Sequence, residues 1–221
     1  KCVINGTLYG RGYTEIGLAN ARRRGEQIDE SLITDESQIK DVFVNFEDPS
    51  LLEHEALDSQ LGAHVKEFLI ALAICHTVVP EKDEEGKLEY RAASPDEMAL
   101  VCAARQLGYE FRARVGRQTT VFIHDQPRAW EVMHVLEFDS DRKRMSVIVR
   151  DLQTDQIKLY CKGADVMIAA RLQQGQASLE PTQQHLEVLG SEGLRTLMVA
   201  VRVLDPAYYE AWAGRYDEAS R

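Results

Sequence analysis

Residues suited to a small, flat and negatively charged ligand occur in several short stretches. The clearest is FDSDRKRMSVIV, residues 138–149, where Phe138 ends one apolar run and three cations precede the next. An aromatic ring can stack on a base, which contributes about 1–3 kcal/mol per base in single-stranded nucleic acids. A nearby cation such as Lys143 can pair with phosphate oxygens. A basic hairpin that balances acidic neighbours explains the stretch equally well.

The sequence SPDE, residues 94–97, is typical of a helix start. Ser94 can accept a hydrogen bond from a free amide, Pro95 suits the first helical position, and Glu97 can reach back to the cap. The local pattern favours this structural interpretation. In the alternative, Glu97 sits on a rigid helix start and accepts a hydrogen bond from a ligand amine.

Two further stretches, KGA and GLRTL, place a cation and a glycine beside apolar strands. Gly163 follows IKLYCK and permits a close backbone approach, such as to a flat ring, with the positive charge of Lys162 beside it. Arg195 precedes an apolar run and can bind phosphate through two hydrogen bonds or pair with an acidic surface. Taken alone, an ordinary strand-to-helix turn is the simpler explanation of KGA.

Composition and missing motifs exclude several classes of function. A formal net charge of −10 argues against a general nucleic-acid binder. The longest uncharged apolar run, residues 68–75, is far shorter than the roughly 20 residues that span a bilayer. The sequence contains no Walker A motif, no GxGxxG opening a helix, no kinase signature and no paired metal-ligand spacing. A nucleotide would therefore be held by stacking and scattered cations.

The order of the expected elements indicates the fold class. Apolar periodicity predicts helices over 61–76 and 95–107. Consecutive strands joined by short polar loops are then predicted over 109–115, 119–124, 130–138, 145–151 and 156–161. A strand over 196–204 and a helix over 206–219 follow. We expect one α+β domain with a largely antiparallel, twisted sheet flanked by helices.

Residues 26–58 differ from the rest in composition. They hold eleven acidic residues and one basic residue, Lys40. This bias predicts a mobile acidic loop with one short strand over 41–46.

The order of the stretches is more specific than any one of them. SPDEMALVCAARQLGYEF, FDSDRKRMSVIV, LYCKGAD and GLRTLMVAVRVL together resemble the nucleotide-binding domain of a type IV P-type ATPase, a phospholipid flippase. The resemblance covers nearly all of residues 1–221, the acidic segment 26–58 excepted. It implies a single nucleotide-binding (N) domain, cut from a larger integral membrane ATPase and exposed to the cytosol.

The resemblance also implies roles for individual residues. Phe138 would stack on adenine, Glu97 would lie near the adenine amine, and Lys162 would lie deep in the pocket. Arg195 would face the phosphates, and Lys143 would approach the nucleotide. The remaining expected pocket residues are Ser140, Met145 and Gly163.

The family phosphorylates an Asp in a DKTGT loop, which this chain lacks, so no catalytic residue is expected here. The resemblance implies that the whole protein couples ATP hydrolysis to phospholipid movement, with Mg²⁺ bridging the phosphates and bound mainly outside this domain. This domain would bind ATP, without hydrolysing it alone, and present the γ-phosphate to the phosphorylation domain. Expected partners are that domain, the actuator domain and, through membrane helices absent here, a phospholipid; an accessory subunit is left open, and no nucleic acid is expected.

Two other functions stay open. A cation-transporting P-type ATPase shares the Phe, Lys-Gly-Ala and Arg positions, although SPDE, RKRMS and KGAD together favour the lipid class. A non-catalytic module whose basic hairpin binds an acidic protein is the third hypothesis.

Overall fold

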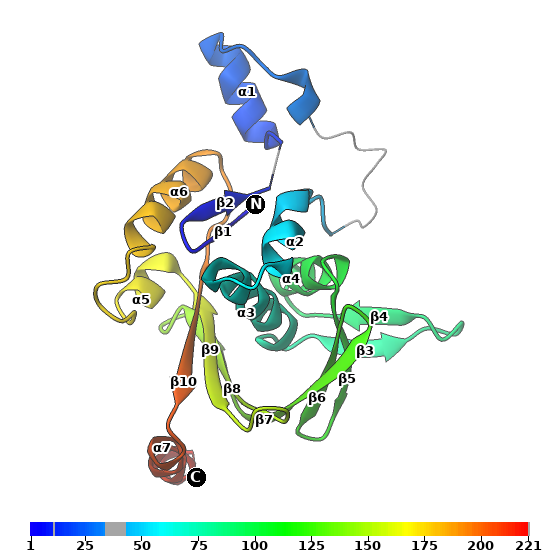
Figure 1. The fold of residues 1–221 in the computed structure, drawn as a ribbon, viewed down its shortest axis with the longest axis vertical. Helices are drawn as coiled ribbons and strands as arrows, with labels where there is room; N and C mark the ends of the chain where they lie inside the picture. The colour runs from blue at the N-terminus through cyan, green and yellow to red at the C-terminus, as the bar shows by residue number, and fades with distance from the viewer. Residues whose placement is uncertain (11, 34–42, 221) are drawn as a thin grey trace.

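A computed structural model describes residues 1–10, 12–33 and 43–220. The main strands are β5 (Tyr109–Val115), β6 (Gln118–Ile123), β7 (Gln126–Asp139), β8 (Arg144–Asp151), β9 (Ile157–Gly163) and β10 (Met198–Leu204). They form one antiparallel sheet in the order β10-β9-β8-β7-β6-β5, so each strand pairs with its neighbours in sequence. The sheet curves around the helices α3 (Gln60–Ile74) and α4 (Pro95–Gln106) (Figure 1). The expected α+β class with an antiparallel sheet is confirmed.

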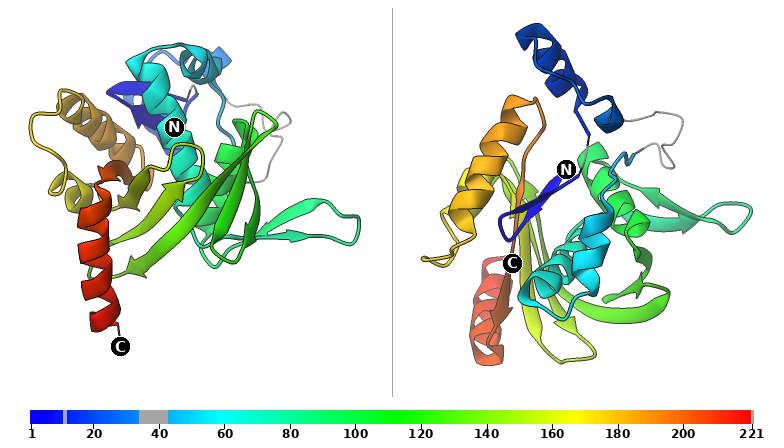
Figure 2. Two further views of the ribbon diagram at one scale, coloured as in Figure 1. Left: turned by 60° about the horizontal axis from the view of Figure 1, so that its bottom comes forward. Right: turned by 45° about the horizontal axis from the view of Figure 1, so that its top comes forward.

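The two faces of this sheet pack against different helices, because side chains alternate along a strand. On β8, Met145 and Val147 belong to the main core, which includes much of α3. Ile148, which lies between Val147 and Val149, belongs instead to a second cluster with Tyr209 of α7 (Pro206–Ala219). Figure 2 shows α7 against the outer face of the sheet, opposite α3.

Helix α3 is the buried axis of the domain. Its first turn is capped by Ser59, whose hydroxyl accepts a hydrogen bond from the Gly62 amide at 3.1 Å. Val65 and Leu69 are fully buried, and the helix is buried on all sides from Leu69 to Ile74. A helix with so much apolar surface is stable only between other layers, here the sheet on one side and α4 on the other.

Smaller elements surround this centre. Strands β1 (Cys2–Ile4) and β2 (Thr7–Tyr9) form a hairpin whose turn, Asn5-Gly6, has positive φ at both residues, as two-residue hairpin turns of this type require. The remaining elements are α1 (Glu15–Arg24), the 3₁₀ helix η1 (Glu30–Leu32), α2 (Pro49–Ala56), β3 (Val79–Lys82), β4 (Leu88–Arg91), α5 (Asp165–Ala169) and α6 (Leu179–Ser191).

The acidic segment 26–58 is not a loop throughout, which corrects the expectation from composition. Besides η1 it contains α2, capped by Asp48, whose carboxylate accepts from the Ser50 amide at 3.1 Å. Leu51 of α2 is fully buried in the main core. Composition misled because Leu51 of α2 packs into the main core, and because the acidic Glu55 is buried too, where it accepts a hydrogen bond from the Tyr109 hydroxyl. The strand expected over 41–46 lies partly outside the described residues, and Val44 forms a single β-bridge.

The burial of α2 can be tested with two adjacent leucines. Leu51→Ala should lower the free energy of unfolding by about 2–5 kcal/mol, because it leaves a cavity in the core. Leu52, which is 38% exposed, is the matched control, and Leu52→Ala should cost much less. Chemical denaturation of both variants measures the difference. Equal, small effects would mean that α2 is not part of the folded core.

Candidate nucleotide-binding site

The predicted site residues converge at one end of the sheet because of its antiparallel topology. Strand β7 ends there at Asp139, β8 begins at Arg144, β9 ends at Gly163, and β10 begins at Met198. Arg144 and Met198 are both register partners of Gly163, so these strand ends lie side by side. Segments far apart in the sequence therefore meet at this end.

Met145 and Lys162 lie on the same face of the sheet at this end, and Phe138 lies at the neighbouring end of β7. Met145 and Lys162 are directly paired between β8 and β9, and paired residues share a face. The β7–β8 register shifts after Leu136, so that Phe138 lies in a bulge before Asp139, which pairs with Arg144. Alternation is interrupted at a bulge, so the register places Phe138 across from Met145 but does not set the direction of its ring. Its ring is 65% exposed.

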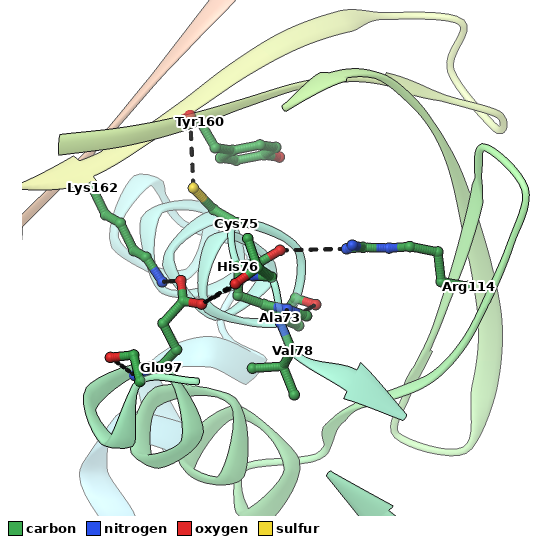
Figure 3. A network of polar contacts seen from close by, with 10 residues as sticks. Ala73, Cys75, His76, Val78, Glu97, Arg114, Tyr160 and Lys162 are labelled. Carbon is green, nitrogen blue, oxygen red and sulfur yellow. Dashed lines mark hydrogen bonds and ion pairs between the residues drawn. The ribbon is translucent and has the colours of Figure 1, made fainter. Parts of the chain in front are cut away.

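Lys162 and Glu97 form the central ion pair of this region (Figure 3). The Nζ atom of Lys162 donates to Oε1 of Glu97 at 2.8 Å, and Lys162 is only 8% exposed. Burial alone would raise the pKa of Glu97, but hydrogen bonds from Lys162 and from Thr77 outweigh it and hold this pKa below its ordinary value. The first turn of α4 is thereby joined to β9.

The SPDE stretch begins a helix as predicted, but Glu97 does not close the capping box. Ser94 caps α4 by accepting a long hydrogen bond, 3.4 Å, from the Glu97 amide. The Glu97 carboxylate turns away from the cap and accepts from Lys162 and from the amide and hydroxyl of Thr77. The favoured structural interpretation was therefore wrong for the carboxylate, because charged and polar donors from other elements compete with the cap amide.

Arg195 reaches the same helix end. Its guanidinium donates to Asp96, the residue before Glu97, in an exposed ion pair. Arg195 lies in the segment between α6 and β10, so α4, β9 and this segment all bring charges to one place. An exposed pair of this kind contributes at most about 1 kcal/mol, which leaves Arg195 available to a stronger anion.

The β7–β8 turn is organised by its own backbone. Asp139 Oδ1 accepts from the amides of Asp141 and Arg142, and Lys143 adopts a left-handed conformation with φ of 50°. Arg142 donates to the carbonyl of Glu137 at 3.0 Å. Arg144 likewise donates to a carbonyl of the turn, that of Arg142, at 2.9 Å. Two of the three clustered cations thus stabilise the hairpin, whereas Lys143 and Ser140 are exposed.

Gly163 is needed for close packing of strands. A Cβ at this position would lie 2.4 Å from the Lys143 carbonyl oxygen and 2.6 Å from the Arg144 Cα. The Ala164 amide donates to that same carbonyl at 3.0 Å. The close approach expected at this glycine is therefore made by the backbone of β8, which sets the position of Lys162 relative to the turn.

A buried polar network behind the ion pair holds the end of α3 in place (Figure 3). The His76 ring is fully buried between the Ala73 carbonyl and the Val78 amide. Burial lowers the pKa of His76 to about 3, so the ring is neutral at pH 7. Arg114 donates to the His76 carbonyl at 3.5 Å. This network fixes the backbone on both sides of Thr77.

Two residues of this region were not found from the sequence, Thr77 and Asp96. Each contacts a predicted site residue that lies 20 or more positions away in the sequence. Asp96 lies inside SPDE and could have been noticed as a counter-charge, but nothing in the local pattern around Thr77 indicates its partner. A separate hollow, lined in part by Glu55, Tyr109 and His124, shares no lining residue with the site.

The comparisons with known proteins identify the family of this chain. The chain belongs to the family "P-type ATPase, cytoplasmic domain N", whose sequence model matches residues 64–220. It is 42% identical over 222 residues to "Phospholipid-transporting ATPase ID" of Homo sapiens, a match that covers 100% of this chain and 18% of the relative.

Similar relatives occur in other organisms. "Phospholipid-transporting ATPase FetA" of Mus musculus is 41% identical over 220 residues, covering 99% of this chain and 18% of the relative. "Phospholipid-transporting ATPase DNF2" of Saccharomyces cerevisiae is 40% identical over 252 residues, covering 100% and 16%. The chain thus spans less than a fifth of these relatives, and the resemblance inferred from the motifs is confirmed.

Membrane and metal features can be stated for the described residues. Among them, no helix is both long and apolar enough to cross a bilayer. In the same part of the chain, no three His, Cys, Asp or Glu side chains are grouped so as to hold a metal ion.

The packing role of Gly163 predicts a strong effect of one methyl group. Gly163→Ala should lower the free energy of unfolding by about 1–3 kcal/mol, because β8 and β9 must separate. Gly190, a helical glycine with open space around it, is the matched control. Gly190→Ala should be neutral or stabilising by up to about 1 kcal/mol. Thermal or urea unfolding checks both, and an unaffected Gly163→Ala would contradict the tight packing.

The lowered pKa of Glu97 predicts a pH dependence with a defined sign. Its charged form is favoured by folding, so the stabilisation is present above the ordinary carboxyl pKa and lost as pH falls through the lower native value. At pH 7, Glu97→Gln should cost about 1–3 kcal/mol in unfolding free energy.

The difference between wild type and Glu97→Gln should shrink as the pH is lowered from neutral to about 3. Urea unfolding at several pH values measures it. Glu187, exposed on α6, provides a control substitution by Gln. A difference that stays constant with pH would show that the Glu97 charge does not contribute.

Proposed function

We propose that this chain is the nucleotide-binding domain of a phospholipid-transporting P-type ATPase and that it binds ATP at the shared end of β7 to β10. The observation that carries the proposal is the meeting of Phe138, Lys162 and Arg195 from three distant segments. Phe138 and Lys162 lie on the two strands that flank Met145, and Arg195 reaches the helix start that Lys162 also contacts. The family assignment supports it independently.

The purine would bind between the sheet face and α4. The exposed Phe138 ring offers a stacking surface, and buried Met145 provides apolar contact beside it. Glu97 is an acceptor suited to the adenine amine, and Lys162 keeps that acceptor charged. Gly163 fixes the strand spacing on which this arrangement depends.

The phosphates would extend toward Arg195 and the β7–β8 turn. Arg195 is exposed and paired only weakly through Asp96, so phosphate oxygens carrying several charges can replace that carboxylate. Lys143 and Ser140 are exposed in the turn and could provide an ammonium and a hydroxyl. Mg²⁺ would be held mainly by the ATP phosphates that it bridges.

In the whole protein, this domain would hold ATP while its γ-phosphate reaches an aspartate on the phosphorylation domain. The contribution of the present chain is proximity and orientation, not bond breaking. It would therefore bind ATP weakly alone and release no phosphate steadily. The phosphorylation and actuator domains would be its partners in the parent chain, and phospholipid would contact membrane helices elsewhere; an accessory subunit is compatible with this scheme.

The names of the relatives favour lipid over ion as the transported substrate. If the full-length protein were a cation pump, its ATPase activity would respond to ions. Stimulation by phospholipid vesicles, with no response to cations in detergent, is the result expected here. The opposite pattern would assign the chain to the cation-transporting branch.

ATP binding is tested with a fluorescent ATP analogue. Phe138→Ala should weaken saturable binding by roughly tenfold, the loss of one stacking contact of about 1–3 kcal/mol. Lys162→Met should weaken it at least as much, because it removes a buried cation beside the ligand.

Each variant has a matched control. Lys158 lies on the same strand as Lys162 and donates to Glu67 at 2.8 Å, so Lys158→Met removes a comparable ion pair away from the site. Tyr208 is an exposed aromatic on α7, and Tyr208→Ala should leave binding unchanged. If the site variants and the controls bind alike, with the fold intact by circular dichroism, the alternative of a protein-interaction module is preferred.

A further inference from the structure

Thr77 makes an unusual double contact with Glu97. Its amide and its hydroxyl both donate to Oε2 of the Glu97 carboxylate, at 3.1 and 2.7 Å. The two donors belong to one residue in the segment that follows α3, whereas the acceptor lies in the first turn of α4. Two hydrogen bonds from one residue fix the rotation of the carboxylate as well as its position.

The double contact assigns different tasks to the two carboxylate oxygens. A carboxylate oxygen accepts about two hydrogen bonds, so Thr77 occupies Oε2. Within the described part of the chain, Oε1 accepts from Lys162 alone, at 2.8 Å, and keeps capacity for one more donor. The oxygen that can accept from a ligand is therefore Oε1, next to the buried Lys162.

The backbone of Thr77 is held firmly although its side chain is exposed. His76 and Val78 on either side are buried, and the Val78 amide donates to Nδ1 of His76 at 3.1 Å. Arg114 binds the His76 carbonyl. An exposed hydroxyl contributes little to core packing, so its use lies in the contact with Glu97.

We propose that Thr77 is a positioning residue for purine selectivity: by saturating Oε2, it directs Oε1 of Glu97 toward the base as an acceptor. Adenine presents an amine donor at the position where guanine presents a carbonyl, as their base edges differ. A fixed carboxylate oxygen attracts the amine and repels the carbonyl. A carboxylate free to rotate can turn away from guanine and discriminates less. This inference rests on the proposed binding of ATP.

The test compares wild type, Thr77→Val and Thr77→Ser in the 221-residue chain. Val matches Thr in shape but removes the hydroxyl, and Ser restores it. A fluorescent ATP analogue is displaced in turn by ATP and by GTP. Thr77→Val should lower ATP affinity by about threefold to tenfold, because the hydroxyl acts on the ligand only through Glu97 and the Thr77 amide still donates to Oε2. GTP affinity should change less, so the ATP-to-GTP preference falls.

The outcomes separate the two proposals. Thr77→Ser should retain the wild-type preference, with all three proteins melting within a few degrees of one another. An unchanged ATP-to-GTP preference in Thr77→Val, or an equal loss in Thr77→Ser, would overturn the role of Thr77 while leaving ATP binding intact. Failure of wild type itself to bind either nucleotide would overturn the proposed function and this inference together.

Discussion

The ion pair between Lys162 and Glu97 is the interaction on which the candidate site depends. It joins the end of β9 to the first turn of α4, and both side chains are largely buried. A buried charge is costly unless it is paired and hydrogen-bonded, so each partner requires the other. Thr77 completes the arrangement by bonding the second carboxylate oxygen. The chain thereby keeps one ammonium group inside a protein of net charge −10.

Two titratable side chains beside this pair are neutral. Burial keeps His76 neutral, and burial also raises the pKa of the Cys75 thiol to about 12, so neither carries charge at pH 7. Lys162 is the buried cation of this pair. Arg195 and Lys143 lie at the exposed margin, where they can reach an anion without a large desolvation cost. The gradient from a buried to an exposed cation suits a ligand with a flat apolar end and a highly charged end.

Antiparallel topology explains how such distant residues meet. Consecutive strands reverse direction, so the end of β7, the start of β8, the end of β9 and the start of β10 lie at the same end of the sheet. The bulge before Asp139 places Phe138 across from Met145, and Gly163 allows β8 and β9 to approach closely. Small backbone features therefore set the positions of the side chains in the candidate site.

Much of the fold followed from the sequence by local rules. Apolar periodicity located α3, α4 and all six strands of the sheet to within a few residues, because these elements bury one face or nearly all of their surface. The Asn5-Gly6 turn and the Ser94-Pro95 helix start were likewise determined by backbone preferences of single residues. The order of four motifs identified the family.

Tertiary structure decided what local rules could not. Helix α2 forms because it packs against α3 and buries Leu51 in the core. Acidic composition gives no sign of that packing, so it pointed to a loop. The carboxylate of Glu97 had two local choices, and it took neither the cap nor an open position, because Lys162 and Thr77 approach from elements 65 and 20 residues away. Side-chain partners across such separations depend on how layers pack, and a single sequence carries no local signal of that packing.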